Sequence, residues 1–298
     1  MSDVSVLGMG AMGSALVEAS AGSGAEVTVW NRTREKADVL SGLRVRVAES
    51  VAEALTSSPL TILSVSDHEV ARSLVDEAGV DLGGNAVAST STVTPDQARD
   101  FDAVVSAAGG HYLDLAILAN ASEVRSRAGV FLISGDRAAY KAHRERFEGI
   151  GMTTYVDDVP GAAYLSGMAV VVAYLPMAVG LLLGRRICEY HDVPLDLFNS
   201  AVLEFYPRQI RLLLEWLAAK RDPSAEDVEG SVDIMGDWAA EFAANLREMG
   251  LDSGMHDSLH QLFAAASGAG YGDAAWTRIA EHTADGETAR QGATRPGR

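Results

Sequence analysis

The chain is poor in cysteine and aromatic residues, and positive charges are outnumbered by negative ones. Its 298 residues include a single cysteine, Cys188, which excludes an internal disulfide and leaves no cysteine cluster for zinc, so we expect no metal. The net charge of −17 disfavours a nucleic-acid surface. A hydrophobic content of 48% and a charged content of 22% are ordinary for a globular protein.

The N-terminus also lacks a basic segment followed by an apolar run, so we expect no secretory signal and a cytoplasmic location. Residues 161–184 carry no charge and are long enough to cross a membrane. Glycines and polar side chains interrupt this stretch, and it follows a complete soluble domain. We interpret it as a helix that is apolar all round and is buried between domains or subunits, which predicts a homodimer and no membrane span.

A glycine turn near the N-terminus is the most informative feature that is present. The pattern predicts a strand at residues 3–7, a helix at 14–21 and a second strand at 26–30. The turn itself has the form G-x-G-x-x-G, typical of dinucleotide-binding proteins. We expect its residues to bind a pyrophosphate at the N-terminus of the helix; they are Gly8, Met9, Gly10, Ala11, Met12 and Gly13. The alternative is a glycine turn without a ligand.

The residues after the second strand predict which dinucleotide binds. NAD-binding units usually carry an acidic residue here for the ribose hydroxyls. This chain has Asn31, Arg32 and Thr33, with Lys36 one turn later. A guanidinium binds phosphate with two parallel hydrogen bonds, which suits the 2′-phosphate of NADP(H). The alternative, a solvated basic turn that begins a helix, is compatible with this prediction.

Strands and helices continue to alternate up to about residue 160. This alternation predicts an α/β fold with a doubly wound parallel sheet, the Rossmann architecture, with ligands at the carboxyl ends of the strands. Two further strand ends therefore belong to the predicted cofactor site. They contribute Val65, Ser66, Asp67, Ser91 and Thr92.

The β signal ends at residue 161, and long apolar and amphipathic helical patterns follow. We therefore predict an NADP-binding Rossmann domain at residues 1–160 and an all-helical domain at 161–284 for substrate binding and dimerisation. Residues 285–298 have almost no apolar side chains, which predicts a disordered tail.

Several motifs together resemble the β-hydroxyacid dehydrogenase and 6-phosphogluconate dehydrogenase superfamily, and within it the NADPH-dependent imine reductases. They are the turn at 8–13, Asn31-Arg32-Thr33, the segments 91–95, 114–119 and 157–163, and Gly270-Tyr271-Gly272-Asp273. The resemblance implies reduction of a C=N bond in a hydrophobic imine or iminium substrate. It also implies a homodimer with interleaved C-terminal helices.

One position departs from the family pattern. Hydroxyacid dehydrogenases have a lysine six residues after the glycine that matches Gly161, and imine reductases usually have Asp or Tyr there. This chain has Gly167, which supplies no proton donor and is expected to leave open space. Ser166 and Tyr164 are the candidate donors, each weighed against a packing role. Two alternatives remain, a hydroxyacid dehydrogenase with an altered acid–base residue and a non-catalytic NADP(H)-binding protein.

Overall fold

The computed structural model describes the chain except for residues 1, 43, 92–93, 219–229 and 283–298. Its contacts divide the chain into two compact units, Met1–Pro176 and Met177–Arg298. We describe each unit by itself. The predicted site residue Thr92 and the predicted tail at 285–298 lie outside the described residues.

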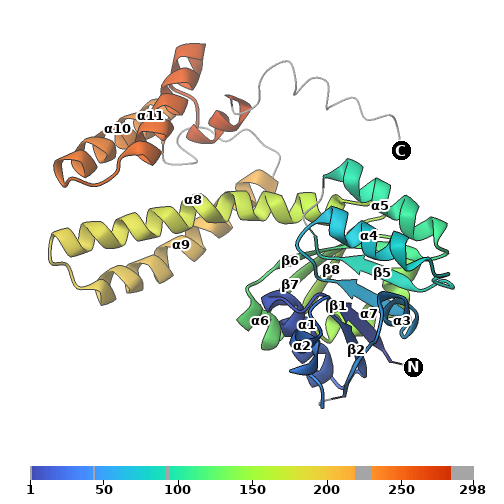
Figure 1. Ribbon diagram of the computed structural model, residues 1–298. Helices are drawn as coiled ribbons and strands as arrows, with labels where there is room; N and C mark the ends of the chain where they lie inside the picture. Colours follow the sequence, from blue (N-terminus) through green and yellow to red (C-terminus); the bar gives the residue numbers. More distant parts are fainter. Residues whose placement is uncertain (1, 43, 92–93, 219–229, 283–298) are drawn as a thin grey trace. The chain divides into compact units, whose positions relative to one another are not determined.

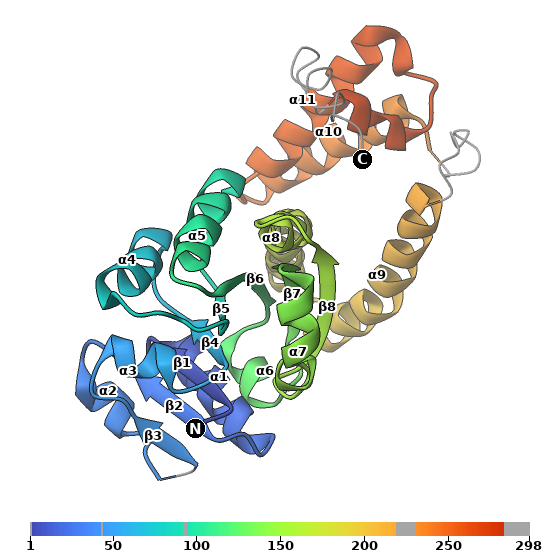
Figure 2. The ribbon, with the colours of Figure 1, turned by 90° about the vertical axis from the view of Figure 1, so that its right-hand side faces the viewer.

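The first unit contains an eight-stranded sheet in the order β3-β2-β1-β4-β5-β6-β7-β8 (Figure 2). The strands are β1 Val4–Leu7, β2 Val27–Trp30, β3 Val45–Val47, β4 Leu60–Leu63, β5 Ala86–Ser89, β6 His111–Leu118, β7 Val130–Gly135 and β8 Met152–Asp157. The chain crosses from β3 to the far side of β1 to form β4, which makes the sheet doubly wound, as predicted.

One pair of strands departs from the predicted parallel arrangement. β6 and β7 are antiparallel, whereas every other neighbouring pair is parallel. The connection between these two strands holds only the short helix α6 Ala121–Arg125. A parallel crossover needs about a dozen residues or more, usually with a longer helix, so this connection returns the chain in the opposite direction.

Helices cover both faces of the sheet (Figure 1). They are α1 Ala11–Gly22, α2 Arg34–Asp38, α3 Val51–Thr56, α4 His68–Ala78, α5 Pro95–Ala107 and α7 Arg137–Glu148, in addition to α6. One face buries a cluster that includes Leu16, Phe131 and Phe147. The other buries a cluster that includes Leu55, Phe101 and Tyr112. Both faces are apolar because a mostly parallel sheet is covered on each side.

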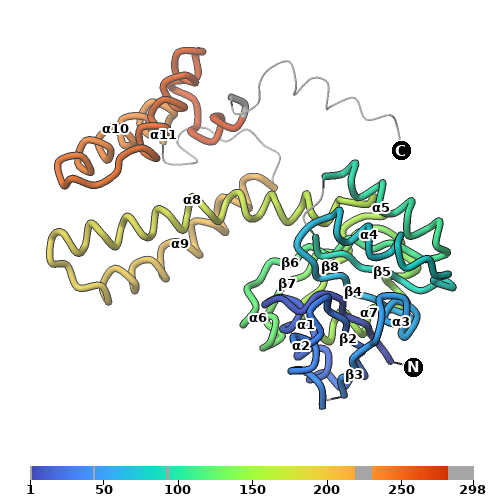
Figure 3. Tube along the Cα trace, in the orientation of Figure 1, coloured from blue at the N-terminus to red at the C-terminus, as the bar shows by residue number. Residues whose placement is uncertain are grey.

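A single helix, α8 Ala162–Tyr190, continues from the first unit into the second (Figure 3). It begins after Gly161, whose φ of +87° is a conformation that favours glycine. The predicted domain border at 160/161 coincides with the start of this helix, whereas the contacts divide the chain inside it, after Pro176. The first half of α8 therefore packs with the sheet.

The described residues of the second unit form helices joined by short loops, with an isolated bridge between Ser231 and Ala275. The elements are α9 Leu195–Ala218, α10 Val232–Glu248, α11 Gly254–Ala266, a π-helical turn Ser267–Tyr271 and a 3₁₀ helix Trp276–His282. α10 and α11 share a small core of Val232, Phe263 and Ala266.

Many apolar side chains on α8 and α9 are exposed. The relative exposure is 65% for Leu182 on α8 and 73% for Leu203 on α9. Among the described helices, α8 is the one whose length and composition would allow it to cross a membrane, with a mean hydropathy of 2.1 over its most apolar window. Only 6% of that window is buried within this chain. The predicted burial of α8 is therefore not supplied by the described residues of a single chain.

Candidate active site

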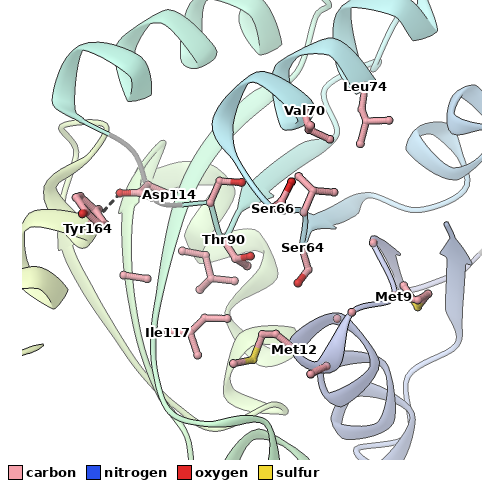
Figure 4. A pocket seen from close by; sticks show the side chains of 18 of the residues that line it. Met9, Met12, Ser64, Ser66, Val70, Leu74, Thr90, Asp114, Ile117 and Tyr164 are labelled. Atoms are coloured by element: carbon pink, nitrogen blue, oxygen red, sulfur yellow. Dashed lines mark hydrogen bonds between the residues drawn. The ribbon is translucent and has the colours of Figure 1, made fainter. Parts of the chain in front are cut away.

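A cavity of about 1250 Å³ lies in the first unit, along the carboxyl ends of the central strands, β6 and the first half of α8 (Figure 4). Most of the predicted site residues line it. These are Gly8, Met9, Gly10, Ala11, Met12, Gly13, Asn31, Arg32, Lys36, Val65, Ser66, Ser91, Tyr164 and Gly167. Thr33, Asp67 and Ser166 do not line it.

The glycine turn has the geometry that a pyrophosphate needs. A Cβ at Gly13 would lie 1.8 Å from the carbonyl oxygen of Gly8, so the turn and α1 can meet this closely only without a side chain. A Cβ at Gly10, by contrast, would have no heavy atom within 4 Å. Gly10 is the N-cap of α1 and no side chain caps it. The free N–H groups of this helix end and the open space beside Gly10 fit a bound phosphate group.

Asn31 connects this turn to the end of β2. Its Oδ1 accepts a hydrogen bond from the Met9 N–H at 2.8 Å, and its Nδ2 donates to the Thr33 carbonyl oxygen at 2.8 Å. Both polar atoms of the Asn31 side chain are thus hydrogen-bonded to the protein backbone. Thr33 is the N-cap of α2 without a side-chain hydrogen bond.

The basic residues after β2 divide into paired and unpaired ones. The Arg34 guanidinium donates to Glu49, with Nη2 and Oε1 3.0 Å apart, and it also lies near Asp38. Arg32 and Lys36 line the cavity and form no ion pair within the described part of the chain. These two cations are therefore the ones available to an anionic ligand.

The loop after β4 uses Asp67 for structure. Its Oδ1 accepts the Val70 N–H at 2.9 Å and caps α4, and its Oδ2 accepts a hydrogen bond from Ser66 at 2.7 Å. These two hydrogen bonds lower the pKa of Asp67. Ser91 lines the cavity and donates to the Asp67 carbonyl oxygen at 3.3 Å. Asp67 thus shapes the loop that presents Ser66 and connects it to Ser91, which follows β5.

Where β6 meets α8, a buried carboxyl holds the start of the helix. Oδ2 of Asp114 accepts the Tyr164 N–H at 3.1 Å and a longer hydrogen bond, 3.5 Å, from the Ser134 hydroxyl. The Ser134 oxygen in turn accepts the Ala163 N–H at 2.9 Å. Asp114 and Ser134 are paired across β6 and β7, so the two strands together cap α8.

Burial is the main influence on this carboxyl. Asp114 is 1% exposed, and burial raises its pKa to about 6 although the hydrogen bonds from Tyr164 and Ser134 oppose the shift. Sequence reasoning placed Asp114 in a motif but assigned it no role. The sequence signal for a role of Asp114 was a single acidic residue inside an apolar strand, because carboxylates are seldom fully buried unless they are paired.

Gly167 lines the cavity, but the space beside it is smaller than expected from the sequence. It is buried, and a Cβ there would lie 3.3 Å from Cβ of Ala116 and 3.6 Å from Cδ2 of Leu118. Glycine at this position lets α8 pack closely on β6. Of the two candidate donors on this helix, Tyr164 lines the cavity and Ser166 does not.

The cavity changes character along its length. In Figure 4, Asp114 and Tyr164 lie at the opposite end from Met9. The charged residues among the described lining are Arg32, Lys36, Glu77 and Asp114. α8 contributes an apolar wall of Met168, Val171, Val172 and Leu175. Among the lining residues that the structure describes, the wall formed by β6 and α8 therefore has no positively charged side chain.

Comparisons with known proteins agree with this geometry. The NAD binding domain of 6-phosphogluconate dehydrogenase matches residues 3–158. The chain belongs to the 6-phosphogluconate dehydrogenase-like superfamily, as its motifs indicate, and it has the fold of the NAD(P)-dependent oxidoreductases in it.

The chain is similar to one group of proteins in sequence and to another in structure. The cytokine-like nuclear factor N-PAC of Homo sapiens is 30% identical over 208 residues, 67% of this chain, and the chain spans only 38% of the length of that protein. Among solved structures, the imine reductase from Pseudomonas sp. has a TM-score of 0.86 at 24% identity, covering 95% of this chain and 99% of that one. The reductive aminase from Aspergillus terreus, in complex with NADPH and ethyl levulinate, has a TM-score of 0.84 at 23% identity, covering 95% and 100%. Both solved structures share the fold of this chain.

Proposed function

We propose that this protein is an NADPH-dependent reductase of C=N bonds in apolar imines or iminium ions. One observation carries the proposal. A single cavity joins a phosphate-binding turn with an unpaired Arg32 to a wall of α8 that is apolar and carries no cation among the described residues. The solved structures that share the fold include imine reductases and reductive aminases.

The residues at the first end of the cavity fit a nicotinamide dinucleotide. The N–H groups at the start of α1 would hold the pyrophosphate beside Gly10, where a side chain is absent. Arg32 and Lys36 would bind the 2′-phosphate, because Arg34 is already paired with Glu49. No acidic residue stands at the end of β2 to favour the ribose hydroxyls of NAD.

The second end of the cavity suits an apolar substrate. When bound, the reduced cofactor supplies a hydride, and the protein contributes position, electrostatics and exclusion of water. Met168, Val171 and Val172 offer an apolar wall, but each is more than 40% exposed in the single chain, so exclusion of water from the reacting bond requires the proposed second copy. An anionic hydroxy acid would require a basic partner, which this wall does not provide among its described residues. For a neutral imine or a cationic iminium ion, Asp114 is the one charged group among the described residues of this wall.

The proposed assembly is a homodimer in which a second copy covers α8 and α9. Apolar side chains such as Leu182 and Leu203 are more than half exposed in the single chain. Exposed apolar patches of that extent mark interaction surfaces. α9 also carries charged residues between its apolar ones, including Glu204, Arg208 and Arg211, which suits a protein partner better than lipid.

The direct test is a substrate comparison. The purified protein is assayed for NADPH oxidation with a panel of cyclic imines and iminium ions, and for NADP⁺ reduction with a panel of β-hydroxy acids. We expect turnover of the first panel alone. Turnover of hydroxy acids alone would establish the alternative dehydrogenase function.

Gly167 favours one further candidate, a non-catalytic NADP(H)-binding protein, because the usual acid–base position has no side chain. Tight binding of NADPH, measured by fluorescence titration, without turnover of either panel would establish this third function.

A further inference from the structure

Capping α8 uses one of the two oxygens of the buried Asp114 carboxyl at the end of the cavity. Oδ2 holds the Tyr164 N–H and the Ser134 hydroxyl. Oδ1 makes no hydrogen bond to any residue that the structure describes. One oxygen of this carboxyl is therefore fixed, and the other is left for a ligand. Asp114 lines the cavity, and Figure 4 shows its contact with Tyr164 at the cavity end.

The same wall has few other sources of a proton. Among the described lining residues that come from β6 and α8, Asp114 and Tyr164 are the ones that can release a proton. Gly167 lines the cavity but contributes no acid, and it packs closely on Ala116. Ser166 does not line the cavity. The chemistry of a neutral imine nonetheless requires a proton at nitrogen as the hydride reaches carbon.

We propose, as an extension of the proposed function, that Asp114 is the proton donor for neutral imines bound against β6 and α8. The Oδ1–H bond of Asp114 breaks and its proton moves to the imine nitrogen. A bound reduced nicotinamide would supply a hydride to the imine carbon and become oxidised, and the π electrons of the C=N bond form the new N–H bond. The product is an amine, and the Asp114 carboxylate regains its proton from water.

The electrostatics of the site suit this role. Because burial raises its pKa to about 6, Asp114 is partly protonated near neutral pH, where general acids work best. The titratable groups around it are Tyr112 on β6, Tyr164 on α8 and, beside Tyr112, Asp102 on α5. Burial, and to a lesser extent the negative charges of Asp114 and Asp102, raise the pKa of Tyr112, which therefore stays neutral. Ser134 and Tyr164 stabilise the carboxylate that remains after transfer.

A preformed iminium ion provides the decisive comparison, because it needs a hydride but no proton. The experiment measures kcat for trimethylindolenine, a weakly basic cyclic imine that stays neutral in the assay range, and for its N-methylated cation. Asp114→Asn keeps the size of the side chain and an acceptor for the Tyr164 N–H but cannot donate the proton. We expect it to lower kcat for the imine by about 10²–10³-fold and kcat for the cation by less than about tenfold.

Ser134→Ala is the matched control, because it removes the other part of the α8 cap and no acid. We expect it to lower turnover of each substrate by less than about tenfold, with the larger loss for the imine because the Ser134 hydroxyl also donates to the Asp114 carboxylate. If Asp114→Asn lowers turnover of both substrates equally, or of neither, Asp114 only positions α8 and the proposal is overturned. NADPH binding, followed by fluorescence, reports whether each variant is folded.

A measurement on the unmodified protein covers the case in which Asp114→Asn does not fold. Turnover of trimethylindolenine should fall as the pH rises through about 6, whereas turnover of its N-methylated cation should not. Parallel profiles for the two substrates would overturn the assignment. If the unmodified protein reduces neither substrate class, the proposed function itself has failed, an outcome that differs from the loss of selectivity in a variant.

Discussion

The nucleotide-binding sheet and helix α8 differ in how much of their apolar surface is buried by their own chain. The central strands of the sheet are buried on both faces by helices of the same unit, and Val6 and Leu7 are 0% exposed. α8 is the more apolar element, yet only 6% of its most apolar window is buried by its own chain. The sheet, which residues of its own chain bury, carries the predicted cofactor site. Helix α8, which its own chain leaves exposed, carries the proposed dimer interface.

The two regions also differ in how their residues come together. The glycine turn and Asn31 lie within one strand–helix–strand unit, and a hydrogen bond from the Met9 N–H to the Asn31 side chain joins them. At α8 the key hydrogen bond joins Asp114 to Tyr164, 50 residues apart in sequence. Local motifs therefore identify the first region, whereas only the tertiary structure reveals the second. The following predictions test this contrast, from the largest expected effect to the smallest.

The largest effect is expected from Gly13→Ala in the sheet unit. The new Cβ would lie 1.8 Å from the Gly8 carbonyl oxygen, so the turn must move and its N–H groups lose their alignment. Losing two hydrogen bonds to a charged phosphate would weaken NADPH binding by more than about 100-fold, measured by fluorescence titration. Gly22→Ala, with no heavy atom within 4 Å of its Cβ, is the control and should bind normally. Equal binding by the two variants would contradict the assigned turn.

On the α8 side, Leu182→Glu should convert the proposed dimer into a monomer. Leu182 is 65% exposed in the single chain, and a buried unpaired carboxylate at a subunit interface costs several kcal/mol, enough to dissociate a micromolar dimer. The measurement is molar mass by light scattering at micromolar concentration. Val39→Glu, at an 83% exposed apolar residue of the sheet unit, is the control and should keep the mass of the unmodified protein. A monomeric unmodified protein would refute the proposed interface.

Arg32→Ala tests the cofactor preference assigned to the end of β2. Loss of a charge-assisted hydrogen bond of about 1.5–3 kcal/mol should weaken NADPH binding by about 10- to 150-fold and leave NADH nearly unchanged. Arg34→Ala should change NADPH binding by less than about threefold, since Arg34 pairs with Glu49 and its charge is exposed. If both cofactors weaken equally in Arg32→Ala, the 2′-phosphate assignment is wrong.

Asp114, at the junction of the two regions, should make stability depend on pH. Its pKa is raised to about 6 in the folded state, so folding favours the protonated form. The stability that this group contributes is therefore full below its unfolded pKa and is lost as the pH rises through about 6. Between about pH 5 and 7.5, the unmodified protein should lose about 1 kcal/mol relative to Asp114→Asn. Urea unfolding above the pI of about 4.7 measures this difference, and parallel curves would contradict it.

The smallest effects are expected at the two donors proposed from the sequence. Ser166→Ala and Tyr164→Phe should each lower turnover by less than about tenfold, below the range of a general acid. Tyr164 contacts Asp114 through its backbone N–H, which the change to Phe retains. Steady-state kinetics with a neutral imine checks both variants. Loss of turnover in either one, with NADPH still bound, would make that residue the proton donor in place of Asp114.

Much of the fold could be predicted from periodicity and turns. The first two strands, the helix between them and the start of α8 lie where the pattern placed them. Thr94 and Gln97 form a capping box at the start of α5, where Pro95 is the first helical residue, a helix-start signal that is present in the sequence. The antiparallel direction of β7 could not be predicted, because strand direction depends on the path of the connection rather than on side-chain alternation.

The sequence by itself determined the parts of this protein whose geometry is local. A glycine is required where a Cβ would clash with a neighbouring carbonyl oxygen, so the spacing of the glycines at residues 8–13 predicts the turn directly. Only the tertiary structure decided that Gly167 packs against Ala116, that Arg34 is paired while Arg32 is not, and that Asp114 caps α8 beside the cavity. Burial and pairing arise between residues far apart in the chain, and they set the charge and the pKa on which the proposed chemistry depends.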